Sequence, residues 1–139
     1  MPRVVHFEIH GTEPERLVEF YTSVFGWTFE KWGDTPYWVI TTGPNTPGPE
    51  GIGINGGLTQ RIGEVPSLDG PVSAYVCIVG VADAQATFDK ALAEGGSEAL
   101  PVTHMPGVGL VGYLRDPDRN LVGIIQPDPD SMPAQEGVR

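Results

Sequence analysis

Residues 4–27 combine a strand-like pattern with a helix-like one. Over 4–10, apolar side chains alternate with His6, Glu8 and His10, which is the two-residue period of a strand with one apolar face. Over 14–25, apolar side chains recur at the spacing of one helical face. We expect these two apolar faces to pack together, so that the three polar side chains face away from the helix. The apolar helix positions are Leu17, Phe20, Tyr21 and Val24.

Local signals place the two ends of this helix. Thr12 stands three residues before Glu15, the spacing of a capping box, and Pro14 falls in the first turn, where its missing N–H costs nothing. Gly26 follows the last apolar position and can take the left-handed conformation that ends many helices. The sequence therefore predicts a strand, a tight connection and a helix that ends at Gly26.

Three more strands are predicted in the first half of the chain. Aromatic and β-branched residues favour strands over 27–32 and 37–42, and Gly and Pro make 43–51 a loop. A fourth strand is predicted over 52–58. Its glycines, Gly56 and Gly57, indicate a place where another backbone or a ligand comes close.

The second half of the chain repeats this order of elements. A continuous apolar run predicts a strand over 72–79, in which Cys77 is expected to be a buried, inert thiol. Asp83 is a candidate N-cap for a helix that ends at Glu94, before Gly95. The expected buried positions of that helix are Ala84, Phe88, Ala91 and Leu92, and further strands are predicted at 99–102, 109–115 and 121–126, with a turn at 116–120.

The two halves correspond at an offset of 68 or 69 residues. At this offset His6 falls on Ala74, and Asn55 falls on Gly123. The predicted fold class is therefore α+β, with two tandem βαβββ modules forming a curved mixed sheet around a central cavity. The predicted boundaries are 1–58 for the first module, 59–71 for a linker, 72–126 for the second module and 127–139 for a loose tail.

Composition narrows the classes of partner. The chain has 139 residues with 18 acidic and 8 basic side chains, a formal net charge of −10, which disfavours nucleic acid because that partner needs basic patches. The acidity either serves solubility alone or favours cationic ligands. No run approaches the roughly 18 apolar residues of a membrane span, and no apolar signal segment is present, so we expect a cytoplasmic protein.

Seven segments together resemble the vicinal oxygen chelate superfamily, which includes glyoxalase I, bleomycin-resistance proteins and extradiol dioxygenases. Within it the chain is most similar to proteins related to lactoylglutathione lyase. The resemblance covers residues 4–126 and implies a homodimer. It is carried by VVHFEI (4–9), PERLVEFYTSVFGW (14–27), YW (37–38), INGGL (54–58), the glycine pair 95–96, PGVG (106–109) and DPDRNLVGIIQ (116–126).

The resemblance also implies four positions that hold a divalent ion in metal-using members. His6 matches the first, because it stands 15 residues before Tyr21. The other three map to Asn55, Ala74 and Gly123, and neither alanine nor glycine has a side-chain donor. We therefore expect no metal centre of the usual kind. A substitute site from His6, Glu8 and Asn55, holding Zn, Ni, Mn or Fe, is the alternative.

Other roles for these residues remain open at this stage. His6 and Glu8 are candidate catalytic residues that could act as an acid–base pair, if a substrate proton comes within about 3 Å. His6 is otherwise a hydrogen-bonded residue that lines the cavity, and Glu8 a solvated acid at its mouth. Asn55, Trp38, Ala74 and Gly123 are candidate ligand-binding positions, and one or two aromatic side chains could stack on a flat ligand.

Three functions follow from these alternatives. The first, which we favour, is a protein that binds a small organic molecule between the modules without the usual metal. The second is a metal-dependent lyase, isomerase or dioxygenase of the glyoxalase I type that uses His6. The third is a non-catalytic interaction protein whose cavity is filled by side chains.

Overall fold

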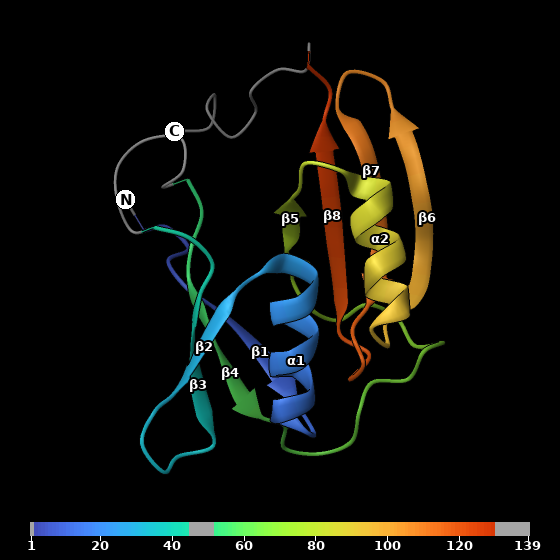
Figure 1. Ribbon diagram of the computed structural model, residues 1–139. Coiled ribbons are helices and arrows are strands. Elements are labelled where there is room, and N and C mark those ends of the chain that lie inside the picture. The colour runs from blue at the N-terminus through green and yellow to red at the C-terminus, as the bar shows by residue number, and fades with distance from the viewer. Residues whose placement is uncertain (1, 45–51, 130–139) are drawn as a thin grey trace. The chain divides into compact units, whose positions relative to one another are not determined.

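The chain divides into two compact units in the computed structural model, which describes residues 2–44 and 52–129 (Figure 1). The first unit is Met1–Pro66 and the second is Ser67–Arg139. Each has the order strand, helix, strand, strand, strand, so the predicted α+β class and the repeated βαβββ order are confirmed. The boundary between the units falls within the predicted linker, and strand β4 takes the first two residues of that linker.

The first unit is a four-stranded mixed sheet with one helix. The strand order is β1-β4-β3-β2, with β1 parallel to β4 and the other pairs antiparallel. Its elements are β1 (Phe7–Gly11), α1 (Pro14–Phe25), β2 (Thr28–Lys31), β3 (Tyr37–Thr41) and β4 (Gly56–Gln60).

The second unit repeats this topology in the order β5-β8-β7-β6. Strand β5 is parallel to β8, and the remaining pairs are antiparallel. Its elements are β5 (Ile78–Gly80), α2 (Ala84–Ala93), β6 (Ser97–Met105), β7 (Gly109–Arg115) and β8 (Leu121–Pro127). Neither helix of the described chain has the length and apolar character needed to cross a membrane.

Each helix covers one face of its own sheet, and the apolar core of the unit lies between them (Figure 1). Alternation along the strands decides which side chains enter the core, because successive residues point to opposite faces. The buried side chains of the first unit are Leu17, Phe20, Tyr21, Trp38, Ile40 and Leu58. Those of the second include Phe88, Ala91, Leu114, Val122 and Ile124.

The start of α1 differs from the predicted capping box. Glu13, not Thr12, is the N-cap residue, and it makes no side-chain capping hydrogen bond. Pro14 explains the difference, because its ring holds φ near the helical value and so makes the residue just before it the boundary. The backbone oxygen of Thr12 instead accepts a hydrogen bond from Gln60 Nε2 at 2.8 Å, which ties the β1–α1 connection to β4.

The strand predicted over 72–79 is much shorter than expected. Only Ile78–Gly80 forms β5, while Val72 and Tyr75 are exposed. Its partner β8 begins at Leu121, only two residues before Gly123, which lies opposite Ile78, so the residues before Val76 have no part of β8 beside them. The prediction of a buried Cys77 was wrong for the same reason, since this free thiol precedes a short edge strand and is exposed.

Two further expectations need correction. Leu92 was placed on the buried face of α2, but it is exposed, and the core positions are Ala84, Phe88 and Ala91 at the i, i+4, i+7 spacing. The fourth strand was predicted over 52–58 and runs from Gly56 to Gln60, which leaves Asn55 just outside it. Parts of the predicted loop and tail, 45–51 and 130–139, lie outside the described residues.

Gly26 ends α1 in the left-handed conformation that the sequence predicts, with φ of 75° and its N–H donating to Thr22 O at 2.9 Å. A Cβ at this position would touch nothing, so Gly26→Ala should cost only the backbone penalty of about 1–2 kcal/mol in the free energy of unfolding. Gly26→Asn should cost less, because Asn tolerates this region. Chemical denaturation of both variants measures the two stability losses. Equal losses in Gly26→Ala and Gly26→Asn would contradict this expectation.

Candidate functional site

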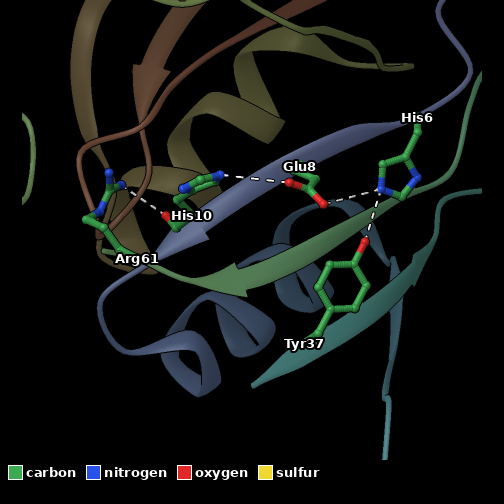
Figure 2. A network of polar contacts seen from close by, with 5 residues as sticks. All are labelled: His6, Glu8, His10, Tyr37 and Arg61. Atoms are coloured by element: carbon green, nitrogen blue, oxygen red, sulfur yellow. Dashed lines mark hydrogen bonds and ion pairs between the residues drawn. The ribbon is translucent and has the colours of Figure 1, made fainter. Parts of the chain in front are cut away.

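A polar cluster lies on the face of the first sheet that is turned away from α1. His6 stands one residue before β1, Glu8 lies on β1, and Tyr37 opens β3 (Figure 2). The Nε2 atom of His6 is 3.0 Å from the Tyr37 hydroxyl and 3.9 Å from Glu8 Oε2. We call these three residues the His6–Glu8–Tyr37 cluster. The sequence placed His6 and Glu8 on one strand face, with an acid–base pair as one of the open alternatives, and the structure adds Tyr37.

Gly57 makes room for the Tyr37 side chain. It lies on β4, between Glu8 on β1 and Val39 on β3, and a Cβ built at Gly57 would overlap the Tyr37 hydroxyl and ring. The ring therefore crosses the sheet over a position with no side chain and reaches His6. A close approach was predicted at the two glycines. At Gly57 the approaching group is the Tyr37 ring, and at Gly56 it is the backbone and ring of Phe7.

Three causes raise the pKa of Tyr37 above its ordinary value of 10.0. Burial is the largest, followed by the negative charge of Glu8 and by a hydrogen bond to Glu8. Each cause disfavours the tyrosinate, so Tyr37 keeps its proton at neutral pH. A hydroxyl held protonated between an imidazole and a carboxylate can donate to either of them, or to the polar group of a ligand.

Glu8→Gln should therefore lower the pKa of Tyr37 toward its ordinary value. A raised pKa means that the folded state holds the proton more tightly. This contribution to stability is complete below the ordinary value and is lost as pH rises through the folded pKa. An ultraviolet titration can measure the change, with Tyr37→Phe identifying this residue among the four tyrosines. Glu30→Gln removes the same charge elsewhere in the unit and should leave the titration unchanged; an equal shift in both variants would contradict the assignment.

His10 extends the polar face along β1 (Figure 2). Its Nε2 atom is 4.0 Å from Glu8 Oε1, on the side of Glu8 opposite to His6. Arg61 Nη2 donates to the backbone oxygen of His10 at 3.0 Å, and the Arg61 N–H donates to Gly11 O at 2.8 Å. These bonds fix the end of β1 against the chain that follows β4.

A pocket of about 470 Å³ adjoins the cluster within the first unit. His6 and Asn55, two of the sequence-predicted site residues, both line it. The side chains of His6 and Glu8 are 46% and 47% exposed, and His6 is the member of the cluster that lines the pocket. Its volume lies within the range of small-molecule sites. The other lining residues are Arg3, Val4, Val5, Thr42, Gly43, Pro44, Ile52, Gly53 and Ile54.

Asn55 has a structural task in this unit. Its Oδ1 atom accepts a hydrogen bond from the Thr42 N–H at 2.8 Å and contacts Thr42 Oγ1 at 3.1 Å. The amide oxygen that would ligate a metal is thus already used by the chain that leaves β3. In the described part of the chain, no group of three His, Cys, Asp or Glu side chains is placed to hold a metal. The donor set present does not fit the four-position centre that the resemblance implies.

The remaining predicted positions belong either to the core of the first unit or to the second unit. Trp38 is 8% exposed in the core under α1, because it alternates with Tyr37 along β3. Ala74 and Gly123 belong to the second unit. Gly123 is buried opposite Ile78, as Gly56 lies opposite Phe7 in the first unit. The offset is 67 residues from Gly56 to Gly123 but 71 from Phe7 to Ile78, so it is not constant between the modules.

Tyr37 is the member of the cluster that sequence reasoning did not single out. Tyr37 and Trp38 are neighbours on one strand, so alternation places them on opposite faces but does not say which of the two faces the core. The usable signal was the glycine at position 57, two positions away across the strand pair, which leaves space for a ring on that face.

Comparison with known proteins places the chain in a family. Residues 3–124 match the family model of the Glyoxalase/Bleomycin resistance protein/Dioxygenase superfamily. "Putative glyoxylase CFP32" from Mycobacterium bovis and from Mycobacterium tuberculosis is 26% identical over 125 residues, which cover 86% of this chain and 43% of the relative. The chain thus spans less than half the length of these curated relatives.

Solved structures with low sequence identity share the fold. TioX from Micromonospora sp. ML1 has a TM-score of 0.63 at 19% identity, covering 91% of this chain and 100% of TioX. A glyoxalase-related enzyme from Fulvimarina pelagi has a TM-score of 0.65 at 18% identity, covering 95% of this chain and 96% of that enzyme. A variant of the fosfomycin resistance protein FosX from Listeria monocytogenes has a TM-score of 0.67 at 12% identity, covering 97% of this chain and 94% of FosX. With the family match over most of its length, the chain belongs to the glyoxalase/bleomycin resistance protein/dioxygenase superfamily.

Proposed function

We propose that this protein binds a small organic molecule at the His6–Glu8–Tyr37 cluster and that it does so without the four-position metal centre of its superfamily. The observation that carries the proposal is the hydrogen bond between His6 and Tyr37 at the edge of a 470 Å³ pocket that His6 itself lines. This arrangement offers an imidazole, a carboxylate and a protonated hydroxyl to one molecule. The polar part of the ligand would contact these three groups, and its apolar part would contact Val4, Val5 and Ile54.

The descriptions of related proteins support a small ligand. The FosX variant was solved with Mn(II) and 1S,2S-dihydroxypropylphosphonic acid, and other relatives are described as glyoxalase or bleomycin resistance proteins. A ligand with hydroxyl, carbonyl or acidic oxygens would match the donors and acceptors of the cluster. If the protein is an enzyme, His6 is the group placed to accept a proton, with Tyr37 and Glu8 orienting its ring.

A divalent metal held by His6 and Glu8 is the second candidate. It is favoured by their separation of 3.9 Å and by the manganese in FosX, and opposed by the hydrogen bonds that already occupy the Asn55 oxygen. Such a protein would be a lyase, isomerase or dioxygenase in which the ion polarises an oxygen of the substrate. Elemental analysis of the purified protein, before and after incubation with Zn, Ni, Mn or Fe, separates the two candidates.

A thermal-shift screen of small hydroxy acids, carbonyl compounds and amines tests the first candidate. A ligand at 100 times its dissociation constant should add about 2.7 kcal/mol to the free energy of unfolding. The effect should disappear in His6→Gln and persist in His104→Gln. His104 is a matched control, since it is also an exposed histidine beside a carboxylate, 3.0 Å from Asp128.

Two results would contradict the proposal. One is a metal bound at one ion per chain in the wild-type protein and lost in His6→Gln. The other is the absence of any ligand response, which would favour the third alternative, a non-catalytic interaction protein with a filled cavity. We also propose, from the family, a cytoplasmic homodimer with no nucleic acid or membrane partner; sedimentation of the purified protein tests the dimer.

A further inference from the structure

A second pocket, of about 410 Å³, lies on the sheet of the second unit, and all of its lining residues come from that unit. It occupies the face turned away from α2, because Gly112 points toward Phe88 of that helix while Tyr113 and Gly123 point the other way. The pocket is separate in residues from the His6–Glu8–Tyr37 cluster. Its lining residues are Val72, Ala99, Leu100, Tyr113, Arg115 and Leu121.

The pocket is apolar apart from two side chains. Leu100 and Val72 are 59% and 56% exposed, so the apolar wall is open to a ligand. Covering such a surface with an apolar group is favourable by roughly 25 cal/mol per Å². The shape and chemistry of the wall therefore favour the hydrocarbon part of a small molecule.

Arg115 gives the pocket a positive charge. Its Nη1 atom donates to the backbone oxygen of Arg119 at 3.1 Å, which directs the guanidinium without neutralising it. Within residues 2–44 and 52–129, Arg115 makes no ion pair with a carboxylate, although acidic residues outnumber basic ones by 18 to 8 over the whole chain. A guanidinium can bind a carboxylate through two parallel hydrogen bonds. Tyr113 also lines the pocket, and its side chain carries a hydroxyl that can donate a hydrogen bond.

We propose that this pocket binds a small carboxylate with an apolar body, in which Arg115 holds the carboxylate and Leu100, Val72 and Leu121 contact the hydrocarbon. Every residue that lines this pocket comes from the second unit, so the inference does not rest on the function proposed for the first unit. The pocket thus binds an anion, whereas the net charge of −10 on the whole chain attracts cations.

Isothermal titration with hexanoate, hexanol and hexylamine tests the charge selectivity. Hexanoate should bind at least tenfold more tightly than hexanol, and hexylamine should not bind. Raising the salt concentration should weaken hexanoate binding, because the anchoring contact is electrostatic. Equal affinities for hexanoate and hexanol, or no binding of hexanoate at all, would overturn the proposal.

Variants assign the binding to Arg115. Arg115→Gln should weaken hexanoate binding at least tenfold, while Lys90→Gln, which removes a positive charge from α2 of the same unit, should leave it unchanged. Hexanoate should shift the amide signals of Leu100 and Tyr113 in a nuclear magnetic resonance titration. If the shifts fall around His6 instead, the second-unit site is wrong. If protein concentration alone produces them and sedimentation shows self-association, the face binds a second copy and the carboxylate proposal fails.

Discussion

Phe20→Ala should lower the free energy of unfolding by about 3–5 kcal/mol, the largest effect expected for one substitution in the first unit. Phe20 is 1% exposed on α1, and its ring packs edge-on against Tyr21, with the centroids 5.0 Å apart. Removing the ring loses its burial and leaves a cavity that the surrounding sheet can fill only in part. A loss of this size is a large share of the 5–15 kcal/mol that a typical domain has.

Urea denaturation with circular dichroism would measure this loss. Phe20→Leu should cost clearly less, because it keeps most of the apolar volume, and Glu19→Ala on the exposed side of the same helix should change stability by less than about 0.5 kcal/mol. A cost below about 1 kcal/mol for Phe20→Ala would show that the helix does not pack on the sheet as described.

Gly57→Ala should remove Tyr37 from the His6–Glu8–Tyr37 cluster without deleting any polar group. The new methyl group would overlap the Tyr37 hydroxyl and ring, so the side chain must rotate away from His6. Since the atoms displaced are the far end of a side chain, stability should fall by only about 1 kcal/mol, at the low end of overpacking costs. The hydrogen bond to His6 would be lost, and a ligand held by the cluster should bind at least tenfold more weakly.

The titration of Tyr37 reports this displacement directly and needs no ligand. Once away from Glu8 and from the sheet, Tyr37 should lose the causes that raise its pKa and titrate nearer to its ordinary value. Gly80→Ala is the matched control, because a Cβ on that β5 glycine meets nothing and the position is not left-handed. An unchanged Tyr37 pKa in Gly57→Ala would contradict the placement of the ring over Gly57.

Patterns of apolar and polar residues were sufficient for the helices and for the repeat. The first helix was predicted from the spacing of its apolar residues and from the glycine that ends it, and α1 runs from Pro14 to Phe25 before left-handed Gly26. Asp83 was predicted as the N-cap of the second helix, and its Oδ1 accepts from the Ala86 N–H at 3.0 Å. Helices are predictable in this way because their hydrogen bonds and caps join residues close in sequence.

Strand limits were predicted less well, because a strand exists only where another strand lies beside it. The apolar run 72–79 has the composition of a strand, yet only Ile78–Gly80 pairs, since β8 starts at Leu121. For the same reason the fourth strand runs over Gly56–Gln60 rather than over the predicted 52–58, because β1 and β3 flank it there. Neither partner can be read from the residues of the strand itself.

The sequence by itself determined the α+β class, the doubled βαβββ order, the family and the shared face of His6 and Glu8, because all of these depend on local spacing or on matching segments. Only the tertiary structure decided that Tyr37 rather than Trp38 joins His6, that the Asn55 oxygen is used by Thr42, and that Arg115 lies in an apolar pocket. These facts depend on contacts between strands that are far apart in the chain. The register of these strands is set by their pairing, and the close contacts depend on glycines that leave space. Neither can be predicted from the spacing of residues within one segment.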